Sequence, residues 1–428
     1  MHPSHSADAR WHWPLAAVAQ FPKRPLHARV PRSHRLRDAA ALALTGILTF
    51  TGVGAGAAAN QITGNIVAVD VETIFADFTQ DTDHARPEMV IPAEYGAGRP
   101  LNILVLGVDT RGGDNDWFAV DEVEGTRSDS TIVMHISADR QHVMMISIPR
   151  DSVVDIPSCP TTTPGRFTQA HAQTRFNAAF AFGYDTGGNV ESGALCTMAT
   201  VEANTNVRLD GFVALDFAGF SRMVDSIGGV QMCIDQTISA PKAGGLFLEA
   251  GCHHFEGWTA TQFARARTGL GLGDGSDLSR IRRQQQLLTS VASRALDLNL
   301  MTDTPTLFRF LNATTRSMTA SSNFASIMGL AALGNSLSSI NMEGVEFVMV
   351  PVSGNPEDMN TVIWNQAGRQ LWEDVRYNRI WATEEPELEA EPGDGTGSDN
   401  SPASNTSASD TTDGETPAPA TRGTLADG

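Results

Sequence analysis

The sequence predicts an α/β fold, in which helices pack against a β-sheet. Short runs rich in β-branched residues alternate with longer helix-like segments along the chain, and this alternation is typical of layered α/β architectures. The chain has 428 residues, of which 41% are hydrophobic. It is therefore long and apolar enough to bury a core of that kind.

A glycine-rich loop at 268–275 separates two of the expected helices. Ser276 or Asp277, directly after this loop, is a suitable N-cap for a long helix. The expected strands are 101–108, 131–137, 142–148, 211–217, 229–234 and 345–352, and the expected helices are 176–182, 190–203, 218–227, 258–265, 276 or 277 to about 298, and 364–376.

The N-terminal region predicts a membrane anchor. Residues 1–38 carry seven arginine or lysine residues against two aspartates, and an apolar run covers 39–59. A basic flank before an apolar run of this length is typical of a transmembrane signal-anchor, with the basic arm in the cytoplasm. We therefore expect a single-pass type II protein of the cell membrane, extracytoplasmic after Asn60. A cleaved signal peptide is the alternative, because Ala57 to Ala59 resemble a cleavage site.

Composition sets the remaining boundaries. We expect a stalk or linker at 60–98, a catalytic domain at 99–383 and a disordered acidic tail at 384–428, where Ser, Thr, Pro, Gly and acidic residues dominate. The tail carries eleven acidic residues and one arginine, or −10 of the net −19. An acidic domain is a poor general binder of polyanions, and the basic arm abuts the apolar run, so we expect no nucleic-acid partner.

All four cysteines lie in the region expected to be exported. An even number of cysteines outside the cytoplasm favours disulfides. Pairing Cys159 with Cys196 and Cys233 with Cys252 closes the shorter loops, and we expect this arrangement. Zinc is disfavoured because no Cys-x-x-Cys pair is present, while free buried thiols remain the alternative.

Two aspartates mark the ends of expected strands. Asp109 follows the strand at 101–108, and Asp129 precedes the strand at 131–137. If these strands are neighbours, the two carboxylates meet at one edge of the sheet. Two hard oxygen ligands, with waters and substrate phosphates, suit Mg²⁺. The alternative is that both residues only make turns.

Arginines accompany these acids. Arg111, Arg127 and Arg150 lie near them in sequence, and Arg150 ends the strand expected to pair with the one that follows Asp129. Guanidinium groups clamp phosphate oxygens well, so one site with both residue types predicts metal-assisted phosphoryl or pyrophosphoryl chemistry. Surface ion pairs are the alternative. Asp151 is expected to orient Arg150, to cap a turn or to act as a base.

A second group of charged residues surrounds the glycine-rich loop. Arg265 and Arg267 precede the loop, and the loop lets a backbone approach an anion closely. On the helix that follows, Arg280, Arg283 and Gln284 share one face. A solvated charged face is the alternative for that helix. The loop lacks the Lys-Ser or Lys-Thr ending of a Walker A motif.

Phenylalanines and histidines carry less information. Phe176, Phe180 and Phe182 are expected in the core, with a groove for a lipid chain as the alternative. His171, His253 and His254 form no local pattern of serine- or cysteine-hydrolase type.

The segments together resemble the LytR-CpsA-Psr family of cell-envelope transferases. The resemblance covers about residues 102 to 291 and rests on NILVLGVDTRGG, RSDSTIVMHIS, MMISIPRDSVVDIP, FNAAFAFGYDTGG, GFVALDFAGFSRMVDSIGGVQMCI and FARARTGLGLGDGSDLSRIRRQQ. It implies a three-layer α/β/α sandwich around a central mixed sheet. It also implies a phosphotransferase that moves a glycopolymer from a polyprenyl-pyrophosphate carrier to the muramic acid 6-hydroxyl of peptidoglycan. A polyprenyl-pyrophosphate pyrophosphatase and a non-catalytic binder of lipid-linked precursors are the alternatives.

The resemblance also implies roles for individual residues. Asp109 and Asp129 would hold Mg²⁺, with Mn²⁺ as the alternative ion. Asp151 or a metal ligand would take the acceptor's proton. The implied pyrophosphate clamp is Arg127, Arg150, Arg265 and Arg267, and the implied further site residues are Arg111, Asp277, Arg280, Arg283 and Gln284.

Overall fold

The computed structural model describes residues 60–82, 85–89, 98–109, 126–298, 304–326, 329–330, 333–334, 337 and 340–381. Within these ranges, no helix is long and apolar enough to cross a membrane. The expected arm at 1–38, the anchor at 39–59 and the tail at 384–428 lie outside the described residues, so those expectations stay predictions.

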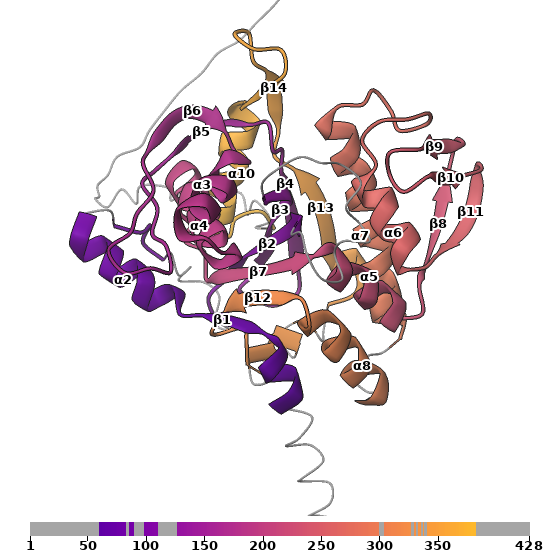
Figure 1. Ribbon diagram of the computed structural model, residues 1–428, viewed down its shortest axis with the longest axis horizontal. Helices are drawn as coiled ribbons and strands as arrows, with labels where there is room; N and C mark the ends of the chain where they lie inside the picture. Colours follow the sequence, from indigo (N-terminus) through magenta and orange to yellow (C-terminus); the bar gives the residue numbers. More distant parts are fainter. Residues whose placement is uncertain are drawn as a thin grey trace, which may run out of the picture. The chain divides into compact units, whose positions relative to one another are not determined.

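A seven-stranded mixed sheet forms the centre of the fold (Figure 1). Its strand order is β1-β12-β7-β2-β3-β4-β13. β2 pairs parallel with β7 and antiparallel with β3, while β4 pairs antiparallel with β3 and parallel with β13. The strands are β1 (Val67–Val69), β2 (Leu101–Asp109), β3 (Arg127–Ile136), β4 (Val143–Ile148), β7 (Gly211–Asp216), β12 (Met318–Ser321) and β13 (Val345–Met349).

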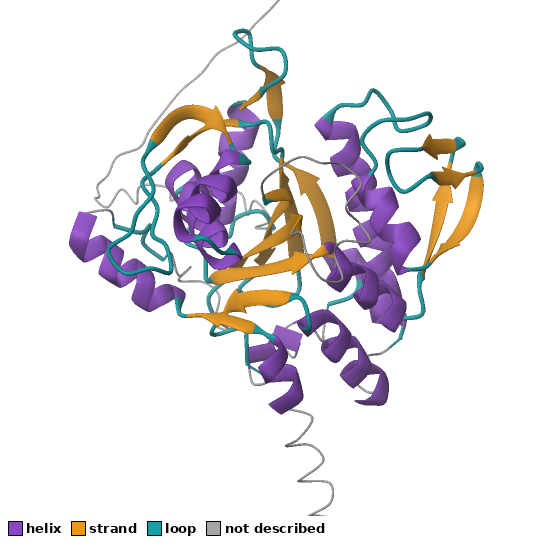
Figure 2. Cartoon of the chain, viewed as in Figure 1, coloured by secondary structure: helices purple, strands orange, loops and turns teal. Residues whose placement is uncertain are grey.

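Helices lie on both sides of this sheet (Figure 2). Leu104 and Leu106 of β2 belong to one buried cluster, with the helices α3, α4 and α10, and Ile103 belongs to another. β2 is buried on both faces because layers cover it from both sides. The expected α/β fold with a central mixed sheet is confirmed. The helices are α3 (Ala178–Gly187), α4 (Val190–Thr205), α5 (Phe217–Ser226), α6 (Gly257–Arg265), α7 (Asp277–Asp297), α8 (Thr304–Thr315) and α10 (Gln366–Arg376).

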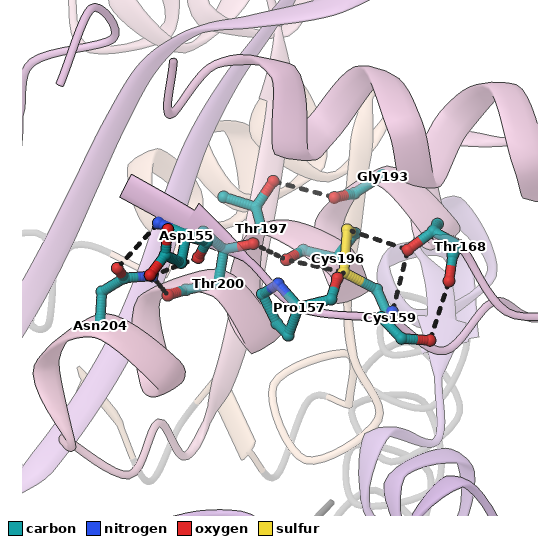
Figure 3. The surroundings of a disulfide bond; sticks show 10 residues. Asp155, Pro157, Cys159, Thr168, Gly193, Cys196, Thr197, Thr200 and Asn204 are labelled. Carbon is teal, nitrogen blue, oxygen red and sulfur yellow. Dashed lines mark hydrogen bonds between the residues drawn. A yellow bond between two sulfur atoms is a disulfide. The ribbon is translucent and has the colours of Figure 1, made fainter. Parts of the chain in front are cut away.

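The expected disulfides are both present. Cys159 bonds to Cys196 of α4, beside the hydrogen bonds of Thr168 (Figure 3). Cys233 bonds to the residue directly opposite it in an antiparallel pair, Cys252. The first bridge ties a loop to the core helix α4, and the second holds two short strands together, β8 (Val230–Ile234) and β11 (Gly251–Phe255).

The structure differs from the stalk expected at 60–98. β1 pairs with β12 in the central sheet, and α2 (Val71–Thr82) buries Phe75 and Phe78. The Nη2 of Arg86 lies 2.6 Å from Oε1 of Glu202, whose side chain is only 3% exposed. The expectation of a stalk is therefore wrong for 60–82 and 85–89. The mixed composition of this region gave no sign of β1 and α2, because both are stabilised by contacts with residues distant in sequence.

Several short elements were not expected from the sequence. Most are strands of three to five residues, too short for an alternating pattern to stand out. They are α2, α8, β1, β12, β5 (Val153–Ile156), β6 (His171–Arg175), β9 (Ile238–Ala240), β10 (Leu246–Leu248), β11, β14 (Val352–Gly354) and β15 (Val362–Trp364). Phe176 and Phe180 are buried in the core, as one of the two interpretations expected.

A buried histidine makes the stability of the fold depend on pH. His135 of β3 is fully covered, its Nδ1 lies 2.7 Å from Oδ1 of Asn102, and its ring stacks on Trp381. Burial lowers the pKa of His135 from 6.5 to about 4, although the side chain of Asn378 acts in the opposite direction. Between these values the unfolded chain binds a proton that the folded protein does not, so stability falls as pH falls.

We expect the free energy of unfolding to drop by roughly 3 kcal/mol between pH 6.5 and pH 4 through His135 alone. Urea unfolding measured across this range should show the drop, and His135→Gln should remove most of it. His254→Gln, at an exposed histidine, should leave the pH dependence unchanged. An equal pH slope in the wild type and His135→Gln would contradict the prediction.

Candidate active site

The candidate site lies where β2 and β4 end and β3 begins. In the register of the antiparallel pair, Asp109 lies opposite Arg127. The register then shifts: Gly107 pairs with Ser130 and Val108 pairs with Ser128, so Asp129 has no partner in β2. Such a bulge frees a residue from the ladder and turns its side chain away from the regular direction. Both carboxylates therefore lie at this edge of the sheet, but Asp109 is paired in the regular ladder whereas Asp129 lies in the bulge.

Asp129 is the point at which three arginines meet. Arg267 contacts its Oδ1, and the same oxygen lies 3.8 Å from Nη1 of Arg280 and 3.9 Å from Nη1 of Arg150. Arg267 lies in the loop after α6 and Arg280 lies in α7, whereas Arg150 lies just after β4 and is distant from both in sequence. Two further carboxylates share these arginines, since Asp277 contacts Arg280 and lies 3.3 Å from Nε of Arg150, and Asp151 lies 3.4 Å from the same Nε. The charges of the cluster are therefore nearly balanced, and Arg267 and Arg150, whose side chains are 44% and 27% exposed, are the arginines that can reach an anion.

Arg280 is the buried centre of this network. Only 2% of it is exposed, and its guanidinium pairs with Asp277 and donates to the backbone oxygen of Asp129 at 2.9 Å. Burial lowers the pKa of Arg280, while Asp277 and Asp129 act in the opposite direction. The group stays charged in proteins, so its two carboxylate partners are needed to compensate it.

Arg150 is held among three carboxylates without a tight bond to any of them. Its Nε lies 3.3 Å from Oδ1 of Asp277 and 3.4 Å from Oδ2 of Asp151. Within the described residues this Nε makes no hydrogen bond although it is covered from solvent. Its backbone N–H donates to Oδ2 of Asp277 at 3.1 Å. The backbone is thus fixed, and Nε retains hydrogen-bonding capacity.

Asp151 has a second partner that sequence reasoning missed. Its Oδ1 lies 3.6 Å from Nη1 of Arg175, whose Nη2 lies 3.4 Å from Oδ2 of Asp358. Arg175 ends β6, immediately before the FNAAFAFG segment of the resemblance. That position was the available signal, but nothing local indicated that a short hairpin brings Arg175 back to Asp151.

The remaining expected residues lie around this centre. Nη2 of Arg265 lies 3.8 Å from Oδ2 of Asp109, and its guanidinium lies over the ring of Phe217 at 4.4 Å. Arg127 is exposed at the start of β3. Arg111 lies outside the described residues, so its role stays a prediction.

Arg283 and Gln284 contact the loop backbone. Arg283 donates to the carbonyl oxygens of Ala266 and Leu272, and Gln284 donates to that of Ala264 at 3.1 Å. These contacts brace both ends of the stretch that carries Arg265, Arg267 and the glycine-rich loop. Ser276 caps the helix behind them by accepting from Ser279 N–H at 3.2 Å.

Two carboxylates at this site, those of Asp109 and Asp129, could hold a hard cation that takes few of its ligands from the protein. Among the described residues, no group of three or more His, Cys, Asp or Glu side chains gathers in a way that could hold a metal ion. Asp109 ends β2 and Asp129 lies near the start of its antiparallel neighbour β3, so both are at one edge of the sheet. Mg²⁺ is usually held by one or two carboxylates together with substrate phosphates and waters, so these two residues are the ones that could hold it.

Comparison with known sequences assigns the chain to a family. Residues 67–378 match the model of the LytR_cpsA_psr family. The chain belongs to this family. The match begins at the first residue of β1 and includes the whole of α10, in agreement with their places in the fold.

Two relatives illustrate how far the likeness extends. "Probable cell wall biosynthesis protein LcpB" of Corynebacterium glutamicum is 30% identical over 56% of this chain and 52% of that protein. "Polyisoprenyl-teichoic acid--peptidoglycan teichoic acid transferase TagU" of Oceanobacillus iheyensis is 29% identical over 56% of this chain and 64% of that protein. This LytR-CpsA-Psr family member therefore spans about half to two thirds of the length of these relatives.

Solved structures share the fold of this family member. The LytR-Csp2A-Psr enzyme of Actinomyces oris matches with a TM-score of 0.50 at 21% identity, over 73% of this chain and 96% of that one. Protein gbs0355 of Streptococcus agalactiae matches with a TM-score of 0.51 at 19% identity, over 65% of this chain and 88% of that one. At these identities the likeness concerns the fold alone.

Proposed function

We propose that this protein is a phosphotransferase that moves a glycopolymer from a polyprenyl-pyrophosphate carrier to the muramic acid 6-hydroxyl of peptidoglycan. The guanidinium groups of Arg150 and Arg267 carry the proposal, since they meet at Asp129 with their side chains 27% and 44% exposed, and Nε of Arg150 has no hydrogen-bond partner among the described residues. A pyrophosphate diester supplies the matching negative charges. Membership of the family and the name of the Oceanobacillus relative, a teichoic acid transferase, support the acceptor and the polymer class.

In the proposed reaction, the acceptor hydroxyl attacks the phosphorus nearest the sugar and polyprenyl phosphate leaves. Arg150 and Arg267 stabilise the charge on the phosphate oxygens as the bond to the leaving group breaks. Arg280, which is buried, positions Asp129 and Asp277 rather than contacting the phosphates. Asp151, whose side chain is 19% exposed, accepts the proton of the hydroxyl.

We further propose that Asp109 and Asp129 hold Mg²⁺ when substrate is bound, with Mn²⁺ as a substitute. A divalent ion at this position adds positive charge to the phosphate oxygens, which lowers the barrier to displacement. The same proposal places the catalytic domain outside the cytoplasm, anchored through residues 39–59. The apolar run in the sequence supports this placement.

A transfer assay with the full-length protein tests the function. A radiolabelled glycan on polyprenyl pyrophosphate, mixed with peptidoglycan and Mg²⁺, should yield wall-bound label. Arg150→Ala should slow this at least about 100-fold, because removal of one charge donor to a transition state has that scale of effect. Arg379→Ala is the matched control, since Arg379 pairs with Asp374 at 3.4 Å and lies over the ring of Tyr377, and neither residue belongs to the candidate site.

Each alternative function has its own outcome in this assay. Label released as free sugar phosphate would make the protein a pyrophosphatase and contradict the transfer. Binding of the lipid-linked glycan without turnover at any Mg²⁺ concentration would make it a binding protein. A reporter fused after Asn60 that is active in the cytoplasm would overturn the proposed location.

A further inference from the structure

A small ribbon beside the candidate site exposes apolar side chains. In the β9–β10 pair, Phe247 lies opposite Ser239, and Ser239 in turn bridges to Leu270 of the glycine-rich loop. The three residues form one row across two strands and the loop beside them, so their side chains share a face. Phe247 is 61% exposed and Leu270 is 68% exposed. Phe247, Ser239 and Leu270 are called the ribbon face below.

The backbone is built to hold Leu270 in this exposed position. Leu270 N–H donates to Ser239 O at 2.9 Å, and Ser239 N–H donates to Leu270 O at 3.1 Å. The loop approaches so closely that a Cβ at Gly269 would lie 2.1 Å from Ser239 O, and one at Gly271 would lie 2.2 Å from Thr237 O. Only glycine fits on either side of Leu270. This close backbone approach holds Leu270 with most of its side chain in solvent.

The opposite face of the ribbon is ordinary core. Leu246 and Leu248 are buried, as are Ile238 and Ala240, and they pack with α6 and α7. The ribbon is therefore fixed to the domain, and the ribbon face is its free side. The turn between β9 and β10 carries Lys242, which is exposed. It is one of only two lysines in the sequence, and it places a positive charge at the tip of an acidic protein.

The ribbon face is continuous with the candidate site. Leu270 follows Arg267 by three residues, and Arg267 contacts Asp129. A long ligand lying on the ribbon face would therefore lead toward the arginine cluster. Figure 1 shows β9 and β10 at the upper right and β1 at the lower edge of the sheet.

We infer that the ribbon face is a docking surface for the acceptor, a glycan strand of peptidoglycan that carries carboxylate-bearing peptide stems. The inference rests on the proposed function and adds the place where the acceptor binds. Sugar rings have apolar C–H faces that pack on aromatic and aliphatic side chains. Lys242 complements the carboxylates of the stems. Two side chains offer too little area for a stable protein interface, whereas a repeating polymer binds usefully through weak contacts.

Co-sedimentation with purified sacculi tests the inference on the full-length protein. Phe247→Ser combined with Leu270→Ser should raise the apparent Kd for sacculi about tenfold, as expected for loss of two packing contacts. Phe247→Ser and Lys242→Gln alone should have smaller effects in the same direction. Leu296→Ser is the control, because Leu296 is 38% exposed at the far end of α7. In the transfer assay, KM for peptidoglycan should rise while kcat stays unchanged.

Two further measurements separate the possible failures. Binding of inorganic pyrophosphate by calorimetry should not change in Phe247→Ser, so a loss there would show damage to the arginine cluster and overturn the inference. Flotation with phosphatidylglycerol vesicles should be equal in all variants, and a loss confined to vesicles would assign the ribbon face to a bilayer. Unchanged sacculus binding in the double variant, or none in the wild type, would also overturn it. Sacculus binding that depends on the ribbon would stand even if no label were transferred.

Discussion

Asp129→Asn should lower the rate of glycan transfer at least about 100-fold, the scale reported for removal of one charge-stabilising group from an active site. The amide keeps the shape of the side chain but loses the charge that balances Arg267, Arg280 and Arg150. The three guanidinium groups would then repel one another, and the proposed cation would lose a ligand. The measurement is kcat at saturating lipid-linked glycan, repeated across Mg²⁺ concentrations.

The control for this variant is Asp139→Asn. Asp139 lies in the turn between β3 and β4, where its Oδ1 accepts from Gln141 N–H at 3.0 Å, outside the candidate site. It should transfer glycan at the wild-type rate. If Asp129→Asn lost activity but higher Mg²⁺ concentrations brought no recovery at all, the role of Asp129 would be confined to ordering the arginines. Full activity in Asp129→Asn would contradict the proposed site.

Arg280→Met should destabilise the domain by about 3 kcal/mol, because removal of one partner leaves buried carboxylates uncompensated. Asp277, with a side chain only 6% exposed, would lose its partner in α7, and Asp129 would lose a donor to its backbone oxygen. Methionine fills a similar volume, so the loss reflects charge and hydrogen bonding more than packing. Urea unfolding at pH 7 measures the change.

Two comparisons make this prediction specific. Arg282→Met, two residues along the same helix at an exposed position, should change stability by less than about 0.5 kcal/mol. Adding Asp277→Asn to Arg280→Met should recover part of the loss, since the uncompensated charge is removed and the two residues are coupled. If the double variant were less stable by the sum of both single effects, the two residues would act independently.

The gathering of charged residues at one edge of the sheet was predictable from the sequence because it depends on residue types next to strand ends. Asp109, Asp129 and Arg150 flank apolar runs of strand length, and an antiparallel arrangement of those runs brings their ends together. The helix face with Arg280 followed from helical periodicity and a suitable N-cap. The disulfides followed from compartment and loop length. These inferences concern neighbours in the chain or a regular repeat, which a single sequence displays.

Other features had no local signal. The bulge that frees Asp129 is one extra residue in a regular strand, and it becomes visible only through the register with β2. The contact of Arg175 with Asp151 depends on a short hairpin. Residues 67–69 lack the length of a clear strand, yet they complete the sheet because β12, about 250 residues later, offers an edge.

The sequence by itself determined which charged groups this LytR-CpsA-Psr family member has, the order of its main elements, and the apolar run expected to anchor it. The tertiary structure decided which of those groups touch. It placed Asp129 against Arg280, separated by 151 positions along the chain, buried that arginine, and held Leu270 outward beside the site. Local patterns reflect backbone geometry and periodic burial, whereas such contacts arise from the packing of distant segments, whose free energy no short window of sequence contains.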